Sequence, residues 1–459
     1  MSTRKSKTPH TVRPTSVHVD CGPVQMRAPA ELTAYERNPR KHPEKQLVKL
    51  MASMRRYGFT QPLLLTAAGE IIAGHARVEA AKRLQLGAVP TLCLDHLTPA
   101  QVREYRLADN QLGSLGAWDM ELLTEELRAI IEIDEISCVE TMGWDIPEVE
   151  IMLDASPALS PDKSDPADEQ LPLSENFVPQ LGDIWLIGKH RLLCGSSLEA
   201  ENWTRLMNGE NAVMSFVDPP YNVPVNGFVC GSGKVRHQEF KMAFGEMSEA
   251  EFTDFLATFL ERMTAHMVDG SITAAAMDFR HMYELQTAAR RVGLSLLNMC
   301  VWNKSNGGMG SLYRSKHELI FIFKKGRVPH INNVMLGVHG RYRANVWDFP
   351  GINSFGKGRM EDLESHPTVK PVALVAECIR DISHPGQIVT DAFLGSGTTL
   401  LAAERTGRRC FGVEIEPKYV DLAIRRWEKL TGREAIRESD GRSYAELIAE
   451  ATGTSQQAA

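Results

Sequence analysis

Residues 213–221 read Val-Met-Ser-Phe-Val-Asp-Pro-Pro-Tyr, and this stretch decides how the chain folds. Its first five residues are mainly apolar, as in a strand buried inside a parallel sheet. Two successive prolines cannot donate to a sheet ladder, so the chain must leave the sheet there. The carboxylate of Asp218, the freed carbonyls of Asp218 and Pro219, and the ring of Tyr221 then meet at one strand end. Such a trio suits the amino group of a flat heterocycle.

A glycine-rich turn follows another apolar strand towards the end of the sequence. The strand 387–390 leads into Asp391-Ala392-Phe393-Leu394-Gly395-Ser396-Gly397-Thr398-Thr399, and we expect a helix to start near Gly397. Glycines permit a tight turn, and the free N–H groups of a helix start favour an anionic or polar ligand. A further strand, 410–414, places Glu414 nineteen residues after Gly395. At this spacing a carboxylate takes both hydroxyls of a ribose.

The loop lacks the full dinucleotide fingerprint, because Leu400 stands three residues after Gly397, where a third glycine is needed. This favours a nucleoside ligand without a pyrophosphate, and S-adenosyl-L-methionine is the obvious cytoplasmic example. Taken alone, the loop is also explained as a tight β-to-α turn packed for stability. The acid at the expected distance and the Asp-Pro-Pro-Tyr motif together weigh strongly against that alternative.

Length and composition bound the class of protein. The 459 residues are 43% hydrophobic and 24% charged, which indicates a soluble protein of two or three domains. The chain has no apolar run of about 18 residues and no signal-peptide core, so we expect a cytoplasmic protein without a membrane partner. The eight cysteines form no Cys-x-x-Cys pair and have no histidine partners at zinc spacing. We therefore expect reduced cysteines and no metal site.

The net charge of −7 conceals one basic stretch. Between Trp302 and Arg343, eight lysines and arginines are opposed only by Glu318. Such an excess predicts a surface that faces phosphates. The alternative is a solvent-exposed surface without a binding role. The candidate DNA-binding residues are Lys304, Arg314, Lys316, Arg341 and Arg343.

A linker divides the chain, because residues 155–180 alternate prolines with acidic residues and show no apolar period. Upstream, we expect a helix from Pro43 to about Gly58, short strands at 62–65 and 71–72, and a helix through Arg83. Thr98 and Gln101 read as a capping box that opens another helix. These elements predict a small α+β unit with a helical tail to about residue 150.

Downstream, the pattern predicts an α/β fold. Ser248 and Glu251 form a second capping box before a helix with one apolar stripe. Helices lie between several of the apolar segments, which favours a doubly wound, mostly parallel sheet. These segments are 271–276, 296–302, 318–323, 387–392 and 409–415.

These residues resemble the amino-group DNA methyltransferases of the β class, in which the catalytic tetrapeptide precedes the cofactor loop. The likeness covers about residues 181–433 and implies the Rossmann-like fold of S-adenosylmethionine-dependent methyltransferases with a permuted motif order. A doubly wound sheet allows this order, because distant strands can meet at the topological switch point. The matching motifs are Gly182–Trp185, His190–Gly195, Asp218–Tyr221, His366–Pro371, Phe393–Thr399 and Gly412–Glu414.

The resemblance implies a role for each motif. Target recognition would lie in about residues 303–360, and residues 434–459 would form a C-terminal tail. Catalysis would rest on Asp218, Pro219, Pro220 and Tyr221. S-adenosyl-L-methionine would be bound by Asp391, Phe393, Gly395, Ser396, Gly397, Thr398 and Glu414, with Lys370 and His366 closing the other side of its pocket.

Residues 15–115 are similar to ParB-like nuclease-fold domains, through Asn38-Pro39-Arg40, Gly58–Pro62 and Gly74-His75-Ala76-Arg77. In that family the last motif approaches a nucleotide phosphate. Here Ala76 precedes Arg77, so the usual consecutive arginine pair is missing and nucleotide binding or hydrolysis does not follow. A structural or DNA-adaptor role is favoured over catalysis. Residues 116–154 would form a helical extension of this domain.

The predicted function is therefore site-specific transfer of a methyl group to the N6 amino group of adenine in duplex DNA, with the base flipped out of the helix. Cytosine-N4 methylation uses the same apparatus, and an aspartate ahead of Pro-Pro-Tyr favours adenine over it. Cytosine-C5 chemistry would need a Pro-Cys nucleophile, and no cysteine follows a proline. The sequence does not reveal the recognition sequence or a restriction partner, and a homodimer is compatible with it.

Three other functions compete with DNA methylation. Protein glutamine methylation also uses an amide amine, but usually with asparagine in place of Asp218. A non-enzymatic ParB-type DNA-binding protein would leave residues 181–433 unexplained. A nuclease would need a carboxylate cluster in the first domain, and the sequence shows none that we can identify.

Overall fold

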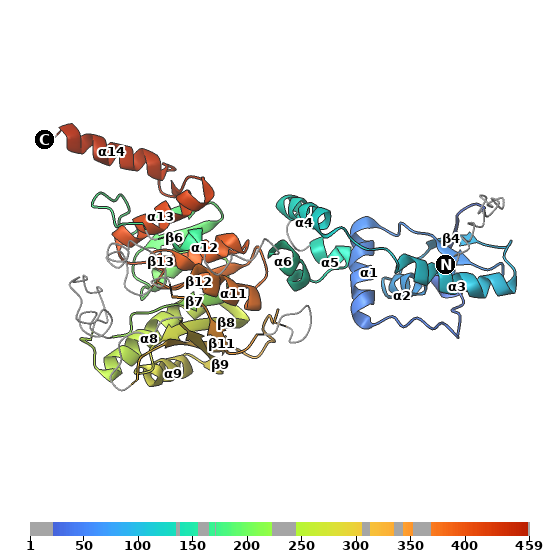
Figure 1. Cartoon of the computed structure of the whole chain (residues 1–459), viewed down its shortest axis with the longest axis horizontal. Coiled ribbons are helices and arrows are strands. Elements are labelled where there is room, and N and C mark those ends of the chain that lie inside the picture. Colours follow the sequence, from blue (N-terminus) through green and yellow to red (C-terminus); the bar gives the residue numbers. More distant parts are fainter. Residues whose placement is uncertain are drawn as a thin grey trace, which may run out of the picture. The chain divides into compact units, whose positions relative to one another are not determined.

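The computed structural model describes residues 22–134, 138–154, 165–169, 171–222, 245–304, 313–334, 343–351 and 369–457. The chain divides into two compact units, Met1–Asp154 and Ala155–Ala459 (Figure 1). Within the described ranges, no helix is long and apolar enough to cross a membrane.

The first unit is a small α+β fold on a four-stranded sheet with the order β1-β4-β2-β3. The predicted helix before Gly58, the two short strands and the capping box of Thr98 and Gln101 are all present. The elements are β1 (Gln25–Arg27), η1 (Pro29–Glu31), α1 (Glu44–Tyr57), β2 (Leu63–Leu65), β3 (Ile71–Ala73), α2 (His75–Arg83), β4 (Val89–Cys93), α3 (Pro99–Gly113), α4 (Met120–Asp134), α5 (Cys138–Met142) and α6 (Ile146–Asp154).

The last three helices of this unit pack around a small core of their own. Leu127, Val139 and Val149 are buried in it. Helix α5 also contacts α1, and Lys45 and Lys49 of α1 both form ion pairs with Asp145. The helical segment predicted after residue 115 is therefore joined to the first unit by side-chain contacts.

The second unit is a doubly wound α/β fold around a ten-stranded sheet with the order β11-β9-β10-β8-β7-β12-β13-β6-β5-β14. Among the described strands only β10 and β5 run against the others, so the sheet is mostly parallel, as predicted. Its elements are η2 (Pro166–Asp168), β5 (Ile184–Ile187), β6 (His190–Cys194), α7 (Ala200–Met207), β7 (Ala212–Val217), α8 (Glu249–Thr264), β8 (Met267–Met277), α9 (Met282–Arg291), β9 (Leu294–Asn303), β10 (His317–Lys325), β11 (Val346–Asp348), α11 (Val372–Ile382), β12 (Ile388–Asp391), α12 (Thr398–Arg405), β13 (Arg409–Glu414), α13 (Pro417–Thr431), β14 (Ile436–Arg437) and α14 (Tyr444–Gln457).

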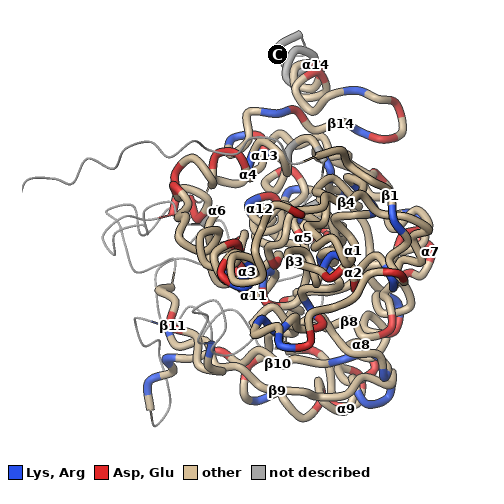
Figure 2. Tube along the Cα trace, turned by 90° about the vertical axis from the view of Figure 1, so that its right-hand side faces the viewer, with Lys and Arg blue, Asp and Glu red and all other residues tan. Residues whose placement is uncertain are grey.

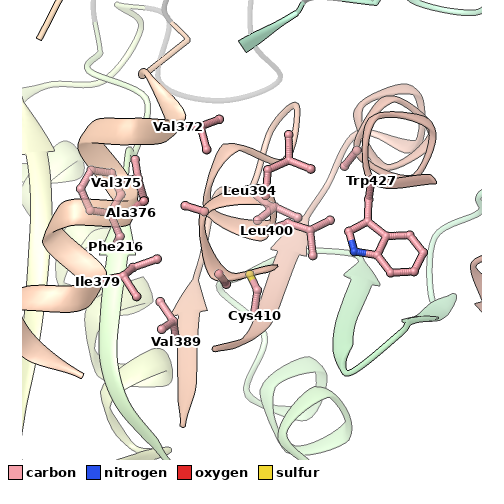
Figure 3. Close-up of a cluster of buried hydrophobic side chains, with 14 of the residues drawn as sticks. Phe216, Val372, Val375, Ala376, Ile379, Val389, Leu394, Leu400, Cys410 and Trp427 are labelled. Carbon is pink, nitrogen blue, oxygen red and sulfur yellow. The ribbon is translucent and has the colours of Figure 1, made fainter. Parts of the chain in front are cut away.

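Helices cover both faces of this sheet. Helices α7, α8 and α9 contribute to one apolar core, and α11, α12 and α13 contribute to the other. Figure 3 shows the second core, where Phe216 of β7 lies beside Val375 and Ile379 of α11. The predicted capping box of Ser248 and Glu251 starts α8. Apolar burial on both faces stabilises the sheet by about 25 cal/mol for each Å² removed from water.

Strand β7 lies where the winding of the sheet reverses direction. It pairs in parallel with β8, the next strand in the sequence, on one side and with β12 on the other. Strand β13 follows β12 in the same direction. The carboxyl ends of β7, β12 and β13 therefore share one edge of the sheet, which is where ligands bind in open α/β folds. Asp218, Asp391 and Glu414 all stand at this edge.

Two segments are more ordered than their composition predicts. Residues 434–459, predicted to be a tail, contain β14, which pairs with β5, and α14, whose Tyr444 donates to Asp421 at 2.6 Å. Residues 165–169, inside the predicted linker, include η2 and bind helices of the second unit through ion pairs and hydrogen bonds. Their partners lie more than 200 positions away, so local composition cannot reveal them.

Candidate active site

Asp218 directly follows β7, and Tyr221 folds back onto it. The hydroxyl of Tyr221 donates to Oδ1 of Asp218 at 2.7 Å. Burial first, and then the charge of Asp218, raise the pKa of Tyr221 well above its usual value, so the phenol keeps its proton. Pro219 and Pro220 lead the chain away from the sheet after the last residue of β7. The tetrapeptide thus presents a carboxylate with an ordered donor beside it.

Lys370 reaches the same carboxylate from the segment just before α11. Its Nζ donates to Oδ2 of Asp218 at 2.5 Å and to the hydroxyl of Tyr221 at 3.3 Å. The side chain is only 3% exposed. The resemblance assigns Lys370 to the cofactor side, but the structure brings its ammonium group to the predicted catalytic carboxylate. Pro371, in an extended conformation, is the cap residue that precedes α11.

Glu318 is a residue of this site that the sequence pattern does not reveal. It lies at the start of β10, and its Oε2 is 3.0 Å from Nζ of Lys370. Lys304, just after β9, donates to Oε1 of Glu318. Burial by itself would raise the pKa of Glu318, but the ammonium groups of Lys370 and Lys304 hold it at about 2. The strand register that places β10 beside β8 brings Glu318 here, and an apolar pattern does not specify register.

Asp391 holds the glycine loop from the end of β12. Its Oδ1 accepts a hydrogen bond from the backbone N–H of Phe393 at 2.9 Å, and its Oδ2 accepts one from the hydroxyl of Thr399 at 2.6 Å. Burial raises the pKa of Asp391 to about 7, against these two hydrogen bonds. Asp391 therefore holds both ends of the loop through hydrogen bonds, which is a structural role.

Glu414 ends β13 beside the same loop. Its Oε2 accepts from the backbone N–H of Gly395 and its Oε1 from that of Glu416, both at 2.8 Å. Burial raises the pKa of Glu414 to about 7 against these bonds. Glu414 therefore lies against the glycine loop, and the predicted ribose contact stays a prediction. The carboxylate of Glu414 is buried at the edge shared with Asp218.

Two further loop residues are used for packing. Gly397 has φ 90°, and a Cβ at this position would lie 2.9 Å from Cβ of Ala423 in α13. Ser396 is buried, and its carbonyl and hydroxyl accept from Arg426 at 2.7 and 2.9 Å. Both residues therefore hold the loop against α13.

Phe393 and Thr398 occupy the ends of the turn. The ring of Phe393 packs edge-on against Phe259, with 4.9 Å between ring centroids, and Thr398 is the first residue of α12. Both side chains are partly exposed. His366, also predicted to contact the cofactor, lies outside the described residues.

A short docking segment, residues 165–169, contacts Arg426 of α13 and the start of α11. Its Ala167 carbonyl accepts from Arg426, the same arginine that holds Ser396, at 2.8 Å. Its Asp168 accepts from the backbone N–H of Val372 at 2.8 Å, two residues after Lys370. Burial raises the pKa of Asp168 to about 6. Residues that precede β5 thus support both the glycine loop and the start of α11.

The predicted DNA-binding residues fall into two groups. Lys304 pairs with Glu318, and Arg343 forms ion pairs with Glu377 and Asp381 of α11 at 3.4 and 3.1 Å. These two cations are therefore already paired with carboxylates of the protein.

Arg314 and Lys316, in contrast, are exposed. Arg341 lies outside the described residues. Acidic and basic positions are interspersed along the described chain (Figure 2), which is consistent with its net charge of −7. Arg314 and Lys316 remain as the exposed members of the predicted set.

The first unit contains a cavity of about 440 Å³. Residues from all three motifs of the predicted ParB-like domain line it, including Asn38, Gln61 and His75. Two lining arginines are held by the protein: Arg77 donates to the carbonyl of Gln61 at 2.9 Å, and Arg40 donates to Asn110 at 2.7 Å. The three motifs therefore share one site in space.

Models of two known families match separate stretches of the chain. A family model described as DNA methylase matches residues 213–425, and a model of the ParB N-terminal domain matches residues 16–111. The chain is 25% identical over 241 residues to type II methyltransferase M.HinfI of Haemophilus influenzae, covering 48% of this chain and 64% of that protein. It is 42% identical over 88 residues to DNA adenine methyltransferase YhdJ of Escherichia coli strain K12, covering 19% of this chain and 29% of that protein.

Solved structures of similar architecture include PvuII DNA methyltransferase, described as cytosine-N4-specific. It is 18% identical with a TM-score of 0.41, and the match covers 56% of this chain and 92% of that one. The chain spans less than two thirds of the length of each of the two curated relatives named above, M.HinfI and YhdJ. The two family matches thus place a likeness to DNA methylases after a likeness to the ParB N-terminal domain in this sequence.

Proposed function

We propose that this protein is a DNA methyltransferase that transfers a methyl group to the N6 amino group of adenine in duplex DNA. One observation carries the proposal: Asp218, which follows β7, Gly395 in the loop after β12, and Glu414 at the end of β13 stand at the same edge of adjacent parallel strands. An acceptor for an amino group and a carboxylate for a ribose therefore lie within one site. The matched DNA methylase family supports the same reading.

S-adenosyl-L-methionine fits the second part of the site. Glu414 offers a buried carboxylate, Gly395 leaves the backbone open for close approach, and Phe393 offers a partly exposed ring. These residues would hold the ribose and the adenine of the cofactor. When bound, S-adenosyl-L-methionine supplies a methyl group on a positively charged sulfur, which an amine can attack.

The residues of the tetrapeptide act on the amine. Its nitrogen is a poor nucleophile because the lone pair is delocalised into the ring. Acceptance of its N–H groups by the Asp218 carboxylate and the Pro219 carbonyl favours a pyramidal nitrogen and stabilises the positive charge that develops there. Stacking on Tyr221 offsets part of the few kcal/mol that base flipping costs. Alignment of the two reactants supplies much of the remaining acceleration.

Adenine is favoured over cytosine on two grounds. An aspartate precedes Pro-Pro-Tyr in this chain, and the curated relative YhdJ, a DNA adenine methyltransferase, is 42% identical over its matched 88 residues. Cytosine-N4 methylation is the alternative, because the same acceptors suit either exocyclic amine.

One experiment separates these outcomes. The full chain is expressed in a host that lacks its own DNA methylation, and the genome is read by a method that distinguishes N6-methyladenine from N4-methylcytosine. We expect N6-methyladenine at one recurrent sequence, and none in a host that expresses Asp218→Ala. N4-methylcytosine would establish the alternative. Unmodified DNA, despite folded protein that binds S-adenosyl-L-methionine, would refute DNA methylation.

A further inference from the structure

The buried charges around Lys370 lead one step beyond the proposed function, on which this inference rests. We propose that Glu318 is a positioning residue that takes over Lys370 when the amino group of the target base binds Asp218. The cation would thus move between two carboxylates, and its move would free the acceptor that the reaction needs.

The acceptor is occupied when no substrate is bound. Oδ1 of Asp218 receives the hydroxyl of Tyr221 at 2.7 Å, and Oδ2 receives Nζ of Lys370 at 2.5 Å. An incoming amino group must therefore share the carboxylate with these donors or displace one of them. Of the two, the bond from Lys370 matters more, because a cation on Asp218 cancels the negative charge that should face the developing positive charge.

Glu318 offers Lys370 a second place to bind. Its Oε2 lies 3.0 Å from Nζ of Lys370, within ion-pair distance. Lys370 already pairs with this buried oxygen, although the contact lacks the angles of a directed hydrogen bond. A buried oxygen without such a bond costs free energy, so it is ready to accept a hydrogen bond when Lys370 turns towards it.

The energetic reason for a second carboxylate is the burial of Lys370. At 3% exposure, an ammonium group that left Asp218 without a new partner would be a buried, unpaired charge, which costs several kcal/mol. A move towards Glu318 keeps the cation paired throughout. The four groups Asp218, Lys370, Glu318 and Lys304 alternate in sign and sum to zero, so the exchange leaves the local net charge unchanged.

Lys304 holds Glu318 in place for this exchange. It donates to Oε1, the carboxylate oxygen that does not face Lys370, and its Nζ lies 4.7 Å from the ring centre of Trp302. Glu318 is thereby fixed from the strand side, while its other oxygen points to Lys370. Lys304 is accordingly a structural partner of the site.

Glu318→Gln tests the inference, because it keeps the size of the side chain and removes its charge. Single-turnover methyl transfer is measured on a duplex with the recognition sequence found by genome sequencing. We expect the rate to fall by about tenfold or more, while the affinity for S-adenosyl-L-methionine changes by less than about threefold. Glu318→Asp, which keeps the charge, should retain more activity than Glu318→Gln. Equal rates in Glu318→Gln and the wild type would overturn the inference.

Glu404→Gln is the matched control. Glu404 is also a partly buried glutamate with an ion pair, to Arg433, but it lies at the far end of α12 from the glycine loop. We expect it to lower thermal stability without a specific loss of the transfer rate. A similar loss of rate in both variants at equal folded fractions would overturn the positioning role.

Coupling to Lys370 separates positioning from simple stabilisation. If Glu318 acts through Lys370, the double variant Lys370→Met/Glu318→Gln should be no slower than Lys370→Met alone, to within about twofold. Losses that multiply in the double variant would contradict action through Lys370.

A binding measurement gives a readout that does not depend on turnover. The wild type should bind a duplex with adenine at the target more tightly than one with purine, which lacks the amino group. In Glu318→Gln this preference should shrink, because Lys370 stays on Asp218. An unchanged preference would overturn the inference, whereas a wild type that methylates no DNA would refute the proposed function instead.

Discussion

Nζ of Lys370 lies 2.5 Å from Oδ2 of Asp218, although the two residues are 152 positions apart in the sequence. The start of α11 and the end of β7 thus meet at one point of the sheet edge. This ion pair makes the catalytic proposal testable, because each member can be changed without touching the glycine loop.

Replacement of Asp218 by alanine should abolish methyl transfer. The variant loses the acceptor for the amino group, and we expect the single-turnover rate to fall by about a thousandfold or more. Calorimetric titration with S-adenosyl-L-methionine should remain near the wild-type affinity, because Glu414 and the glycine loop are intact. Asp254→Ala, on the exposed face of α8, serves as the control. A near-normal rate in Asp218→Ala would refute the assigned role.

Cofactor binding should depend on pH through Glu414. Its pKa of about 7 in the ligand-free protein means that the carboxyl is protonated at pH 6 and ionised at pH 8. The ionised form accepts both ribose hydroxyls better, so affinity should rise as pH increases through 7 and level off above it. Glu414→Gln should bind more weakly and lose this pH dependence. If its titration matched the wild type, Glu414 would not belong to the pocket.

Gly397→Ala should damage the glycine loop more than an equivalent change elsewhere. The new Cβ would lie 2.9 Å from Cβ of Ala423, and φ at this position is 90°. We expect a loss of about 2 to 4 kcal/mol in stability of the second unit and weaker cofactor binding. Gly432 also has positive φ, 69°, but has open space around it, so Gly432→Ala should cost only about 1 kcal/mol. Equal melting temperatures in the two variants would contradict the packing role.

Arg426 should matter more than its neighbour Arg425. Arg426 is 4% exposed and donates to Ser396 and to Ala167, so it joins the glycine loop to the docking segment. Arg426→Met would leave those acceptors unpaired, with an expected cost of about 2 to 4 kcal/mol and reduced cofactor affinity. Arg425 is 24% exposed, and its partner Asp421 keeps a hydrogen bond from Tyr444, so Arg425→Met should have a smaller effect. Differential scanning calorimetry and cofactor titration on both variants decide the matter.

Arg314 and Lys316 should contribute to DNA affinity through phosphate contacts. Their double replacement by alanine should weaken duplex binding and lower the slope of log affinity against log salt by up to about 2. Measurements at several salt concentrations would show it, with Lys324→Ala as a comparison that removes one charge from the same stretch outside the predicted DNA-binding set. An unchanged salt slope would show that neither residue contacts DNA phosphates.

The sequence predicts those parts of the protein that local pattern encodes. Gly58 at the end of α1, the capping boxes at Thr98 and Ser248, and the strand before Asp218 all appear where expected. The spacing of Glu414 from Gly395 predicts a ribose ligand, and the structure places the two residues in contact through a hydrogen bond that the sequence does not predict.

Contacts that depend on strand register and on distant partners are not predicted. Glu318 looks like a stray acid in a basic stretch, and only the pairing of β10 with β8 places it beside Lys370. Asp165 looks like part of a linker, and only the arrival of Arg405, 240 positions later, gives it a partner. Arg343 looks like a phosphate ligand until α11 supplies Asp381.

The place of β7 in the sheet has a consequence for how the protein is made. Its two neighbours are β8, which follows soon after it, and β12, which begins 171 positions after β7 ends. At about 5 to 20 residues per second, a ribosome needs about 10 to 30 seconds to travel between them. During that interval the nascent chain carries Asp-Pro-Pro-Tyr on a strand with one side unpaired. Under the proposed function, the catalytic edge cannot form before β12 has been made, so a chain that ended before β12 should not transfer a methyl group.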